Sequence, residues 1–131
     1  MRSGRGCLTI LVLDNDVAHL ETFEDLLVQD GHSVFPTTLG SEAVRIALRE
    51  PIDLSFLDFD LPDLDGIETF TRIRKERPRL PGIFISGNPS EFLETWVLEA
   101  GGFALLRKPL SPPQVRSIVL EVMERFIPGS S

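Results

Sequence analysis

Short apolar runs alternate with amphipathic segments along the whole chain, and this alternation constrains the fold more than any other feature. The apolar runs cover residues 7–13, 32–35, 52–57, 81–86 and 102–106. Each run precedes a segment with apolar residues at helical spacing, and these segments cover 17–29, 41–50, 65–76, 88–100 and 111–126. Runs that are apolar on both faces indicate strands covered by helices on two sides. The pattern therefore predicts the α/β class, with a doubly wound parallel sheet.

Capping residues support the predicted helix boundaries. Asp16, Asp65, Asn88 and Ser111 each precede a helical segment, where a short polar side chain can accept a backbone N–H. All but the first have Glu or Gln three positions later, as in a capping box. Gly31 follows the first helix, at a position where a left-handed backbone conformation commonly ends a helix.

The composition is typical of one globular domain. Of the 131 residues, 42% are hydrophobic and 25% are charged. Twenty acidic and 13 basic residues give a formal charge of −7, which argues against direct binding to nucleic acid or an anionic membrane. No segment has the roughly 18 apolar residues of a membrane span. The single cysteine, Cys7, favours a reducing cytoplasm. We expect a domain over residues 8–127, with flexible segments at 1–7 and 128–131.

Polar side chains with related chemistry follow four of the predicted strands. They are Asp14, Asn15, Asp16, Asp58, Ser86 and Lys108. The carboxyl ends of parallel strands meet at one edge of a sheet, where open α/β sheets bind their ligands. Clustered carboxylates repel one another unless a cation offsets them, and Mg²⁺ prefers oxygen ligands of this kind. A carboxylate can also act as a nucleophile toward a phosphoryl group, whose oxygens a lysine can stabilise.

These residues and their order resemble the receiver domain of two-component response regulators. The resemblance extends from about Leu8 to Phe126, and the segments that carry it are ILVLDND, DGHSV, DLSFLDFDLPDLDGIE, IFISG, EAGGFALLRKPL and the closing helix. It implies a single flavodoxin-like (CheY-like) domain, in which a five-stranded parallel sheet of order 2-1-3-4-5 packs against five helices. It also implies a signalling module rather than an enzyme that turns over a separate substrate.

The resemblance further implies a phosphoacceptor site. Asp58 would accept a phosphoryl group from a histidine kinase or a phosphotransfer protein, in a reaction that requires Mg²⁺. Asp14, Asn15, Asp58 and the backbone carbonyl of Asp60 would hold the metal.

The family also implies roles around the phosphoryl group and for the signal. Ser86 would be the switch hydroxyl, and Lys108 would pair with the phosphoryl group ahead of a cis Pro109. Signalling would follow by conformational change or dimerisation. A homodimer through the face of the fourth helix, fifth strand and fifth helix is one implied partner, and an output domain outside this sequence is another.

Two positions depart from the family pattern. Most receivers carry a second acid where this chain has Asn15, whose amide can ligate a metal but brings no charge. We therefore expect weaker Mg²⁺ binding, unless Asp16 turns inward to compensate. Leu105 stands where receivers usually have a switch Tyr or Phe. These differences leave open a pseudo-receiver, which would act as a protein-interaction domain without phosphorylation.

A phosphatase or mutase is a further alternative, because DFD at residues 58–60 resembles the start of the haloacid-dehalogenase motif. That family generally has Thr or Val two residues later, where this chain has Pro62.

Several other residues have simpler interpretations. Asp63 and Asp65 are expected to serve turns and helix caps. His19 and His32 have no acid or cysteine at ligand spacing and are expected to be structural or solvated. Trp96 is expected either to face a partner or to pack against the last strand.

Overall fold

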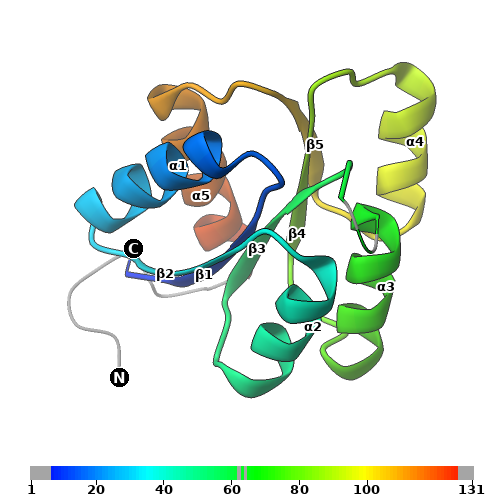
Figure 1. Cartoon of the computed structure of the whole chain (residues 1–131), viewed down its shortest axis with the longest axis horizontal. Coiled ribbons are helices and arrows are strands. Elements are labelled where there is room, and N and C mark those ends of the chain that lie inside the picture. Colours follow the sequence, from blue (N-terminus) through cyan, green and yellow to red (C-terminus); the bar gives the residue numbers. More distant parts are fainter. Residues whose placement is uncertain (1–6, 62, 64, 127–131) are drawn as a thin grey trace.

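The computed structural model describes residues 7–61, 63 and 65–126 (Figure 1). Strands and helices alternate through this part of the chain, as predicted. The elements are β1 (Thr9–Leu13), α1 (Val17–Gln29), β2 (Ser33–Thr37), α2 (Gly40–Arg49), β3 (Leu54–Asp58), α3 (Gly66–Glu76), β4 (Gly82–Ser86), α4 (Glu91–Glu99), β5 (Ala104–Arg107) and α5 (Pro112–Phe126).

The strands form one parallel sheet in the order β2-β1-β3-β4-β5. Helices α1 and α5 cover one face of the sheet, and α2, α3 and α4 cover the other (Figure 1). The predicted doubly wound fold with five helices is confirmed. The strand order reverses between β1 and β3, so a binding crevice is expected at the carboxyl ends of these two strands.

Both faces of the sheet bury apolar side chains, which explains the continuous apolar runs. Alternate residues of the central strands serve opposite cores: Val12 and Phe56 pack with α1 and α5, whereas Leu13 and Leu57 pack with the other three helices. All four side chains are fully buried. Because such strands bury both faces, charged side chains first appear where the strands end.

Three predicted helix caps and one predicted turn are confirmed. Asp16 and Asp65 cap α1 and α3, each accepting a backbone N–H three residues on, at 3.1 and 2.7 Å. Ser111 does the same for α5 at 3.3 Å. Gly31 has a φ of 94°, the left-handed conformation expected after α1.

Two predicted boundaries are wrong. Helix α4 is capped by Ser90 rather than Asn88, because the Ser90 hydroxyl accepts the N–H of Leu93 at 3.1 Å. The N–H of Asn88 donates instead to the hydroxyl of Ser86. Strand β2 continues past its predicted end through Pro36, which an edge strand tolerates.

The ends of the chain are described only in part. Of the segments predicted to be flexible, residues 1–6 and 128–131 lie outside the described residues, and Cys7 is half-buried. Across the described ranges, no helix is both long and apolar enough to cross a bilayer.

His32 has a structural role beside the start of β1. Its Nδ1 accepts the backbone N–H of Leu8 at 3.0 Å, which requires an unprotonated Nδ1. Burial lowers the pKa of His32, although Asp30 opposes this effect. As the pH falls below about 6.5, the unfolded chain takes up a proton before the folded one does, so the free energy of unfolding decreases.

We expect His32→Asn to remove this pH dependence, because an amide oxygen can accept the same N–H and does not titrate. Urea denaturation on either side of pH 6.5 measures it. The gap in unfolding free energy between wild type and variant should change with pH, and parallel profiles would contradict the assignment.

Candidate functional site

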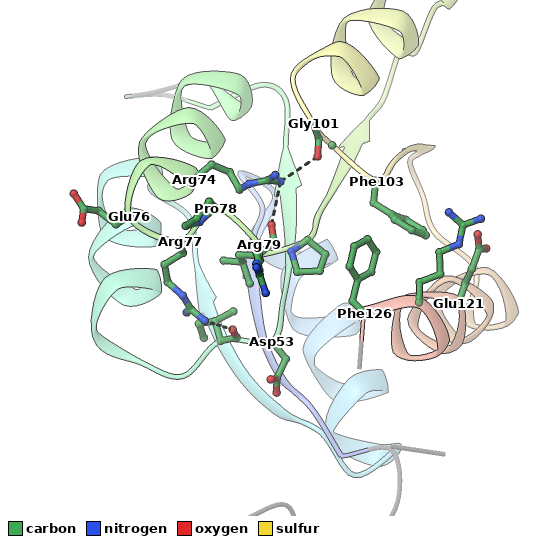
Figure 2. A pocket seen from close by; sticks show the side chains of 15 residues that line it. Asp53, Arg74, Glu76, Arg77, Pro78, Arg79, Gly101, Phe103, Glu121 and Phe126 are labelled. Carbon is green, nitrogen blue, oxygen red and sulfur yellow. Dashed lines mark hydrogen bonds between the residues drawn. The ribbon is translucent and has the colours of Figure 1, made fainter. Parts of the chain in front are cut away.

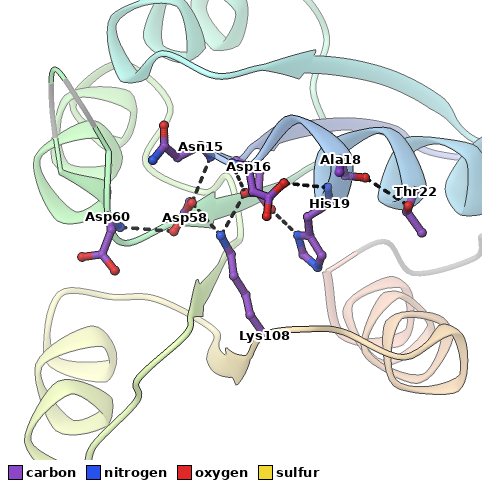
Figure 3. Close-up of polar contacts among 9 residues, drawn as sticks. Asn15, Asp16, Ala18, His19, Thr22, Asp58, Asp60 and Lys108 are labelled. Atoms are coloured by element: carbon purple, nitrogen blue, oxygen red, sulfur yellow. Dashed lines mark hydrogen bonds and ion pairs between the residues drawn. The ribbon is translucent and has the colours of Figure 1, made fainter.

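Three charged side chains meet where β1, β3 and β5 end. Asp14 follows β1, Asp58 is the last residue of β3, and Lys108 follows β5. The Lys108 ammonium lies 2.9 Å from Asp14 Oδ1 and 2.8 Å from Asp58 Oδ2, so it bridges the two carboxylates (Figure 3). The peptide bond between Lys108 and Pro109 is cis, as predicted. The structure thus brings together three of the predicted site residues.

Both carboxylates are buried and accept backbone hydrogen bonds. Asp14 is fully buried and Asp58 is 2% exposed. Asp14 accepts the N–H of Asp16 at 2.9 Å, and Asp58 accepts those of Asn15 and Asp60 at 3.0 and 3.1 Å. Such bonds stabilise ionised carboxylates where burial alone would be costly. The two carboxylates share one ammonium, so this trio keeps a net negative charge.

The pKa values in the site favour the ionised groups. Burial raises the pKa of Asp14, but hydrogen bonds with His19 and Lys108 outweigh that effect, and the pKa lies below its ordinary value. Burial lowers the pKa of Lys108, but its hydrogen bonds to Asp58 and Asp14 more than offset this, and the pKa is raised. At neutral pH Asp14 is therefore a carboxylate and Lys108 an ammonium.

Asn15, Asp16 and Asp60 contribute main-chain groups to the site. The Asn15 side chain is exposed and points away from Lys108 in Figure 3. Asp16 does not turn inward, because its carboxylate caps α1. The compensation that the sequence left open for Asp16 is therefore absent. Asp60 also has an exposed side chain, and the ligand roles predicted for Asn15 and for the Asp60 carbonyl remain predictions.

Ser86 ends β4 beside the site but takes no part in the ion pairs. It is 3% exposed, and its hydroxyl accepts the N–H of Asn88 at 3.0 Å. Its carbonyl accepts the N–H of Lys108 at 2.9 Å, which fixes the segment carrying the lysine next to β4. The predicted switch role of the Ser86 hydroxyl remains a prediction.

Gly66 explains how α3 can begin so close to the end of β3. A Cβ at this position would lie 2.5 Å from the carbonyl oxygen of Asp58 and 3.2 Å from Cα of Phe59. Both of these are main-chain atoms, which cannot rotate away as a side chain can. Glycine is therefore required by the close approach of two backbone segments.

We expect Gly66→Ala to lower the free energy of unfolding by about 2 kcal/mol, because the backbone around Asp58 must shift. Gly87→Ala is the matched control, since nothing lies within 4 Å of a Cβ there. Urea denaturation compares the two variants. Equal stabilities would show that the loop after β3 adapts without cost.

His19 belongs to the site although the sequence prediction treated it as structural or solvated. Its Nδ1 forms a hydrogen bond with Asp14 Oδ2 (Figure 3). Its ring packs edge-on against Phe23, with centroids 5.9 Å apart. The sequence places His19 in the first turn of the helix that Asp16 caps, five residues after Asp14, but this spacing does not fix the direction of its side chain.

An aromatic contact joins the site to α4. Phe59 follows Asp58 directly, and its ring centroid lies 5.7 Å from that of Trp96. Trp96 is 39% exposed, so it packs against Phe59 while keeping part of its ring in solvent. Leu105 is half-buried in the core on the same face of the sheet.

A cavity of about 1080 Å³ lies far from these residues, beside the segments that lead into β3, β4 and β5 (Figure 2). Two of its arginines are held by main-chain carbonyls. Arg74 donates to Leu80 and Gly101. Arg77 donates to three carbonyls in and after the last turn of α2, where a cation also complements the helix dipole. These two arginines therefore stabilise loops and a helix end.

The two carboxylates offer ligands suited to a hard divalent cation. Each has about four lone-pair sites, and the hydrogen bonds described above use three on Asp14 and three on Asp58. Within the described ranges, no group of three or more His, Cys, Asp or Glu side chains is arranged to hold a metal. A metal would therefore depend on two carboxylates, main-chain carbonyls and water, a donor set that fits Mg²⁺.

Comparison with known proteins decides the family. Residues 10–120 match the family model of the response regulator receiver domain. The chain belongs to this family. The receiver domain is 32% identical over 116 residues to the alkaline phosphatase synthesis transcriptional regulatory protein PhoP of Bacillus subtilis. That match covers 88% of this chain but only 48% of PhoP, so the chain spans about half the length of this relative. The family match favours the receiver over the haloacid-dehalogenase alternative.

Solved structures share the fold of this receiver domain. A response regulator receiver domain protein from Clostridium thermocellum superposes with a TM-score of 0.84 and 26% identity, covering 90% of this chain and 95% of that one. A chain of the CheX-CheY-BeF₃-Mg²⁺ complex from Borrelia burgdorferi gives a TM-score of 0.82 and 27% identity, covering 88% and 89%.

Proposed function

We propose that this receiver domain accepts a phosphoryl group on Asp58 from a histidine kinase or a phosphotransfer protein, in a reaction that requires Mg²⁺. The observation that carries the proposal is the Lys108 ammonium held between two buried carboxylates at the strand ends. The structural similarity to a chain of the CheX-CheY-BeF₃-Mg²⁺ complex supports it. The cytoplasmic location expected from the sequence remains a prediction.

Three side chains of the site have different roles in the proposed phosphoryl transfer. An oxygen of Asp58 attacks phosphorus, so that a P–O bond forms while the P–N bond of a phosphohistidine donor breaks and its electron pair stays on the imidazole. Lys108 pairs with a phosphoryl oxygen and stabilises the charge that develops there. The Ser86 hydroxyl, now bonded to the N–H of Asn88, turns to a second phosphoryl oxygen.

Asp14, Asp58 and the carbonyl of Asp60 would hold the metal. When bound, Mg²⁺ would act as a Lewis acid and neutralise negative charge on the phosphoryl oxygens. Because the Asn15 side chain is exposed and uncharged, we expect it to contribute little to binding. Magnesium affinity should therefore be weaker than in a receiver with a second acid at this position.

The test is chemical phosphorylation of the purified domain. Acetyl phosphate or phosphoramidate with Mg²⁺ should add the mass of one phosphoryl group to the peptide containing Asp58, and EDTA should prevent it. Absence of an adduct after hours with saturating Mg²⁺ would contradict the proposal.

Exposed apolar side chains favour a second candidate, a protein-interaction domain that works without phosphate. Phe92, Trp96 and Leu98 on α4 are 81%, 39% and 54% exposed, and Leu120 and Phe126 on α5 are 53% and 48% exposed. A homodimer or an output domain docked on α4 would cover the first three, whereas Leu120 lies on the side of α5 that faces α1, beside Leu27 and Asp30. Sedimentation with and without beryllofluoride separates the candidates, because only a phosphorylation-driven dimer depends on the analogue and is lost in Asp58→Ala.

A further inference from the structure

His19 is held on three sides in the first turn of α1. Its backbone N–H donates to Asp16 at 3.1 Å, its Nδ1 bonds Asp14, and its ring edge meets Phe23. Phe23 is itself 3% exposed and packs against Phe56 in the core, with ring centroids 4.7 Å apart. The imidazole is therefore fixed in position relative to the sheet.

The bond to Asp14 also fixes which ring nitrogen carries a proton. An ionised carboxylate only accepts hydrogen bonds, so Nδ1 must be the donor. The other oxygen of Asp14 is bound by the N–H of Asp16 and by the Lys108 ammonium, both at 2.9 Å. Among the described residues, only His19 forms a hydrogen bond with Oδ2. Without it, one oxygen of a fully buried carboxylate would lose its donor and the group could rotate.

We propose that His19 is a positioning residue that holds the Asp14 carboxylate in the orientation needed to bind Mg²⁺. The inference rests on the proposed phosphoacceptor function. Because Asn15 supplies no charge, Asp14 is the carboxylate from the loop after β1 on which the metal depends, so its orientation matters more than in a site with two acids. Hydrogen-bond partners behind a metal ligand commonly change metal affinity by about 10-fold to 100-fold when they are removed.

Two substitutions separate the hydrogen bond from the packing of the ring. His19→Phe keeps an aromatic ring against Phe23 but has no N–H for Asp14. His19→Asn loses the ring but carries an amide N–H near the position of Nδ1. We expect His19→Phe to weaken Mg²⁺ binding by about 10-fold in calorimetric titration, and His19→Asn to stay close to wild type. His32→Asn, which changes a histidine outside the site, is the matched control.

A nuclear magnetic resonance measurement without metal tests the contact itself. Long-range ¹H–¹⁵N spectra of the histidine ring should show Nδ1 of His19 protonated in the wild type. Its nitrogen shifts should move in Asp14→Ala, whereas those of His32 should not. An unprotonated Nδ1 would overturn the inference, because such a nitrogen cannot donate to Asp14.

The outcomes distinguish this inference from the function on which it rests. If wild type binds Mg²⁺ and a folded His19→Phe binds it equally well, the positioning role is overturned while phosphorylation of Asp58 stands. If folded His19→Phe and His19→Asn lose the same amount of Mg²⁺ affinity, the positioning role is also overturned, because the loss would then come from the ring rather than from the hydrogen-bond donor. If wild type binds no Mg²⁺, the proposed function fails, and the positioning role fails with it.

Discussion

Asp58→Asn is expected to abolish phosphorylation by acetyl phosphate completely. The amide is isosteric with the carboxylate, so the fold should persist, but its nitrogen is a poor nucleophile and its oxygen carries no charge. Asp14 is not expected to substitute as the acceptor, because in the proposed site it is a metal ligand and His19 holds its second oxygen. Intact-mass spectrometry after incubation with Mg²⁺ and acetyl phosphate measures the loss.

Asp60→Asn is the matched control for this loss. Asp60 lies two residues from Asp58 and its side chain is exposed, so the substitution removes a nearby charge without touching the buried pair. The main-chain carbonyl predicted to bind metal is retained. Phosphorylation should therefore continue in Asp60→Asn. An adduct that persists in Asp58→Asn and disappears in Asp60→Asn would move the acceptor to Asp60.

The architecture could be predicted because it follows from local patterns. Strands apolar on both faces and alternating with amphipathic helices leave few arrangements other than a parallel sheet between two helical layers. A parallel sheet brings all its carboxyl ends to one edge, so Asp14, Asp58 and Lys108 had to be close even though 94 residues separate the first from the last. The prediction that these three residues meet therefore depended on sheet topology and not on their separation in the sequence.

The contacts that could not be predicted depend on directions that residue spacing does not encode. The His19 side chain reaches Asp14 because α1 packs with Phe23 against the sheet, and spacing alone does not specify that packing. A turn or a helix cap is expected of Asp63, but the sequence does not predict which helix it caps: it accepts the N–H groups of Gly40 and Ser41 at the start of α2, more than 20 residues away. Arg77 likewise reaches the end of α2 from beyond α3. The bonds of Asp63 and Arg77 each join a flexible polar side chain to a backbone whose position is set only after the layers pack, and the His19 bond joins a side chain on α1 to one that follows β1 in the same way.

Lys108→Met is expected to have the largest effect on stability. The variant keeps the length and apolar stem of the side chain but removes the ammonium that Asp14 and Asp58 share. Two buried carboxylates then face each other without a cation, and breaking a buried pair in this way costs several kcal/mol. Because the Lys108 side chain is 20% exposed, we expect a loss of about 3 kcal/mol in the free energy of unfolding at neutral pH.

The pH dependence of that loss identifies its cause. In the wild type the lowered pKa of Asp14 contributes stability above about pH 3.8, and this contribution disappears as the pH falls through the folded pKa. In Lys108→Met, burial remains but a main opposing partner is gone, so the pKa of Asp14 rises and protonation relieves the repulsion. The difference in the free energy of unfolding between wild type and Lys108→Met should therefore become smaller as the solution is acidified. Lys75→Met is the matched control, because Lys75 lies on the exposed side of α3. Its free energy of unfolding should equal that of wild type at every pH. A gap that stays constant with pH would assign the effect to packing of the stem rather than to its charge.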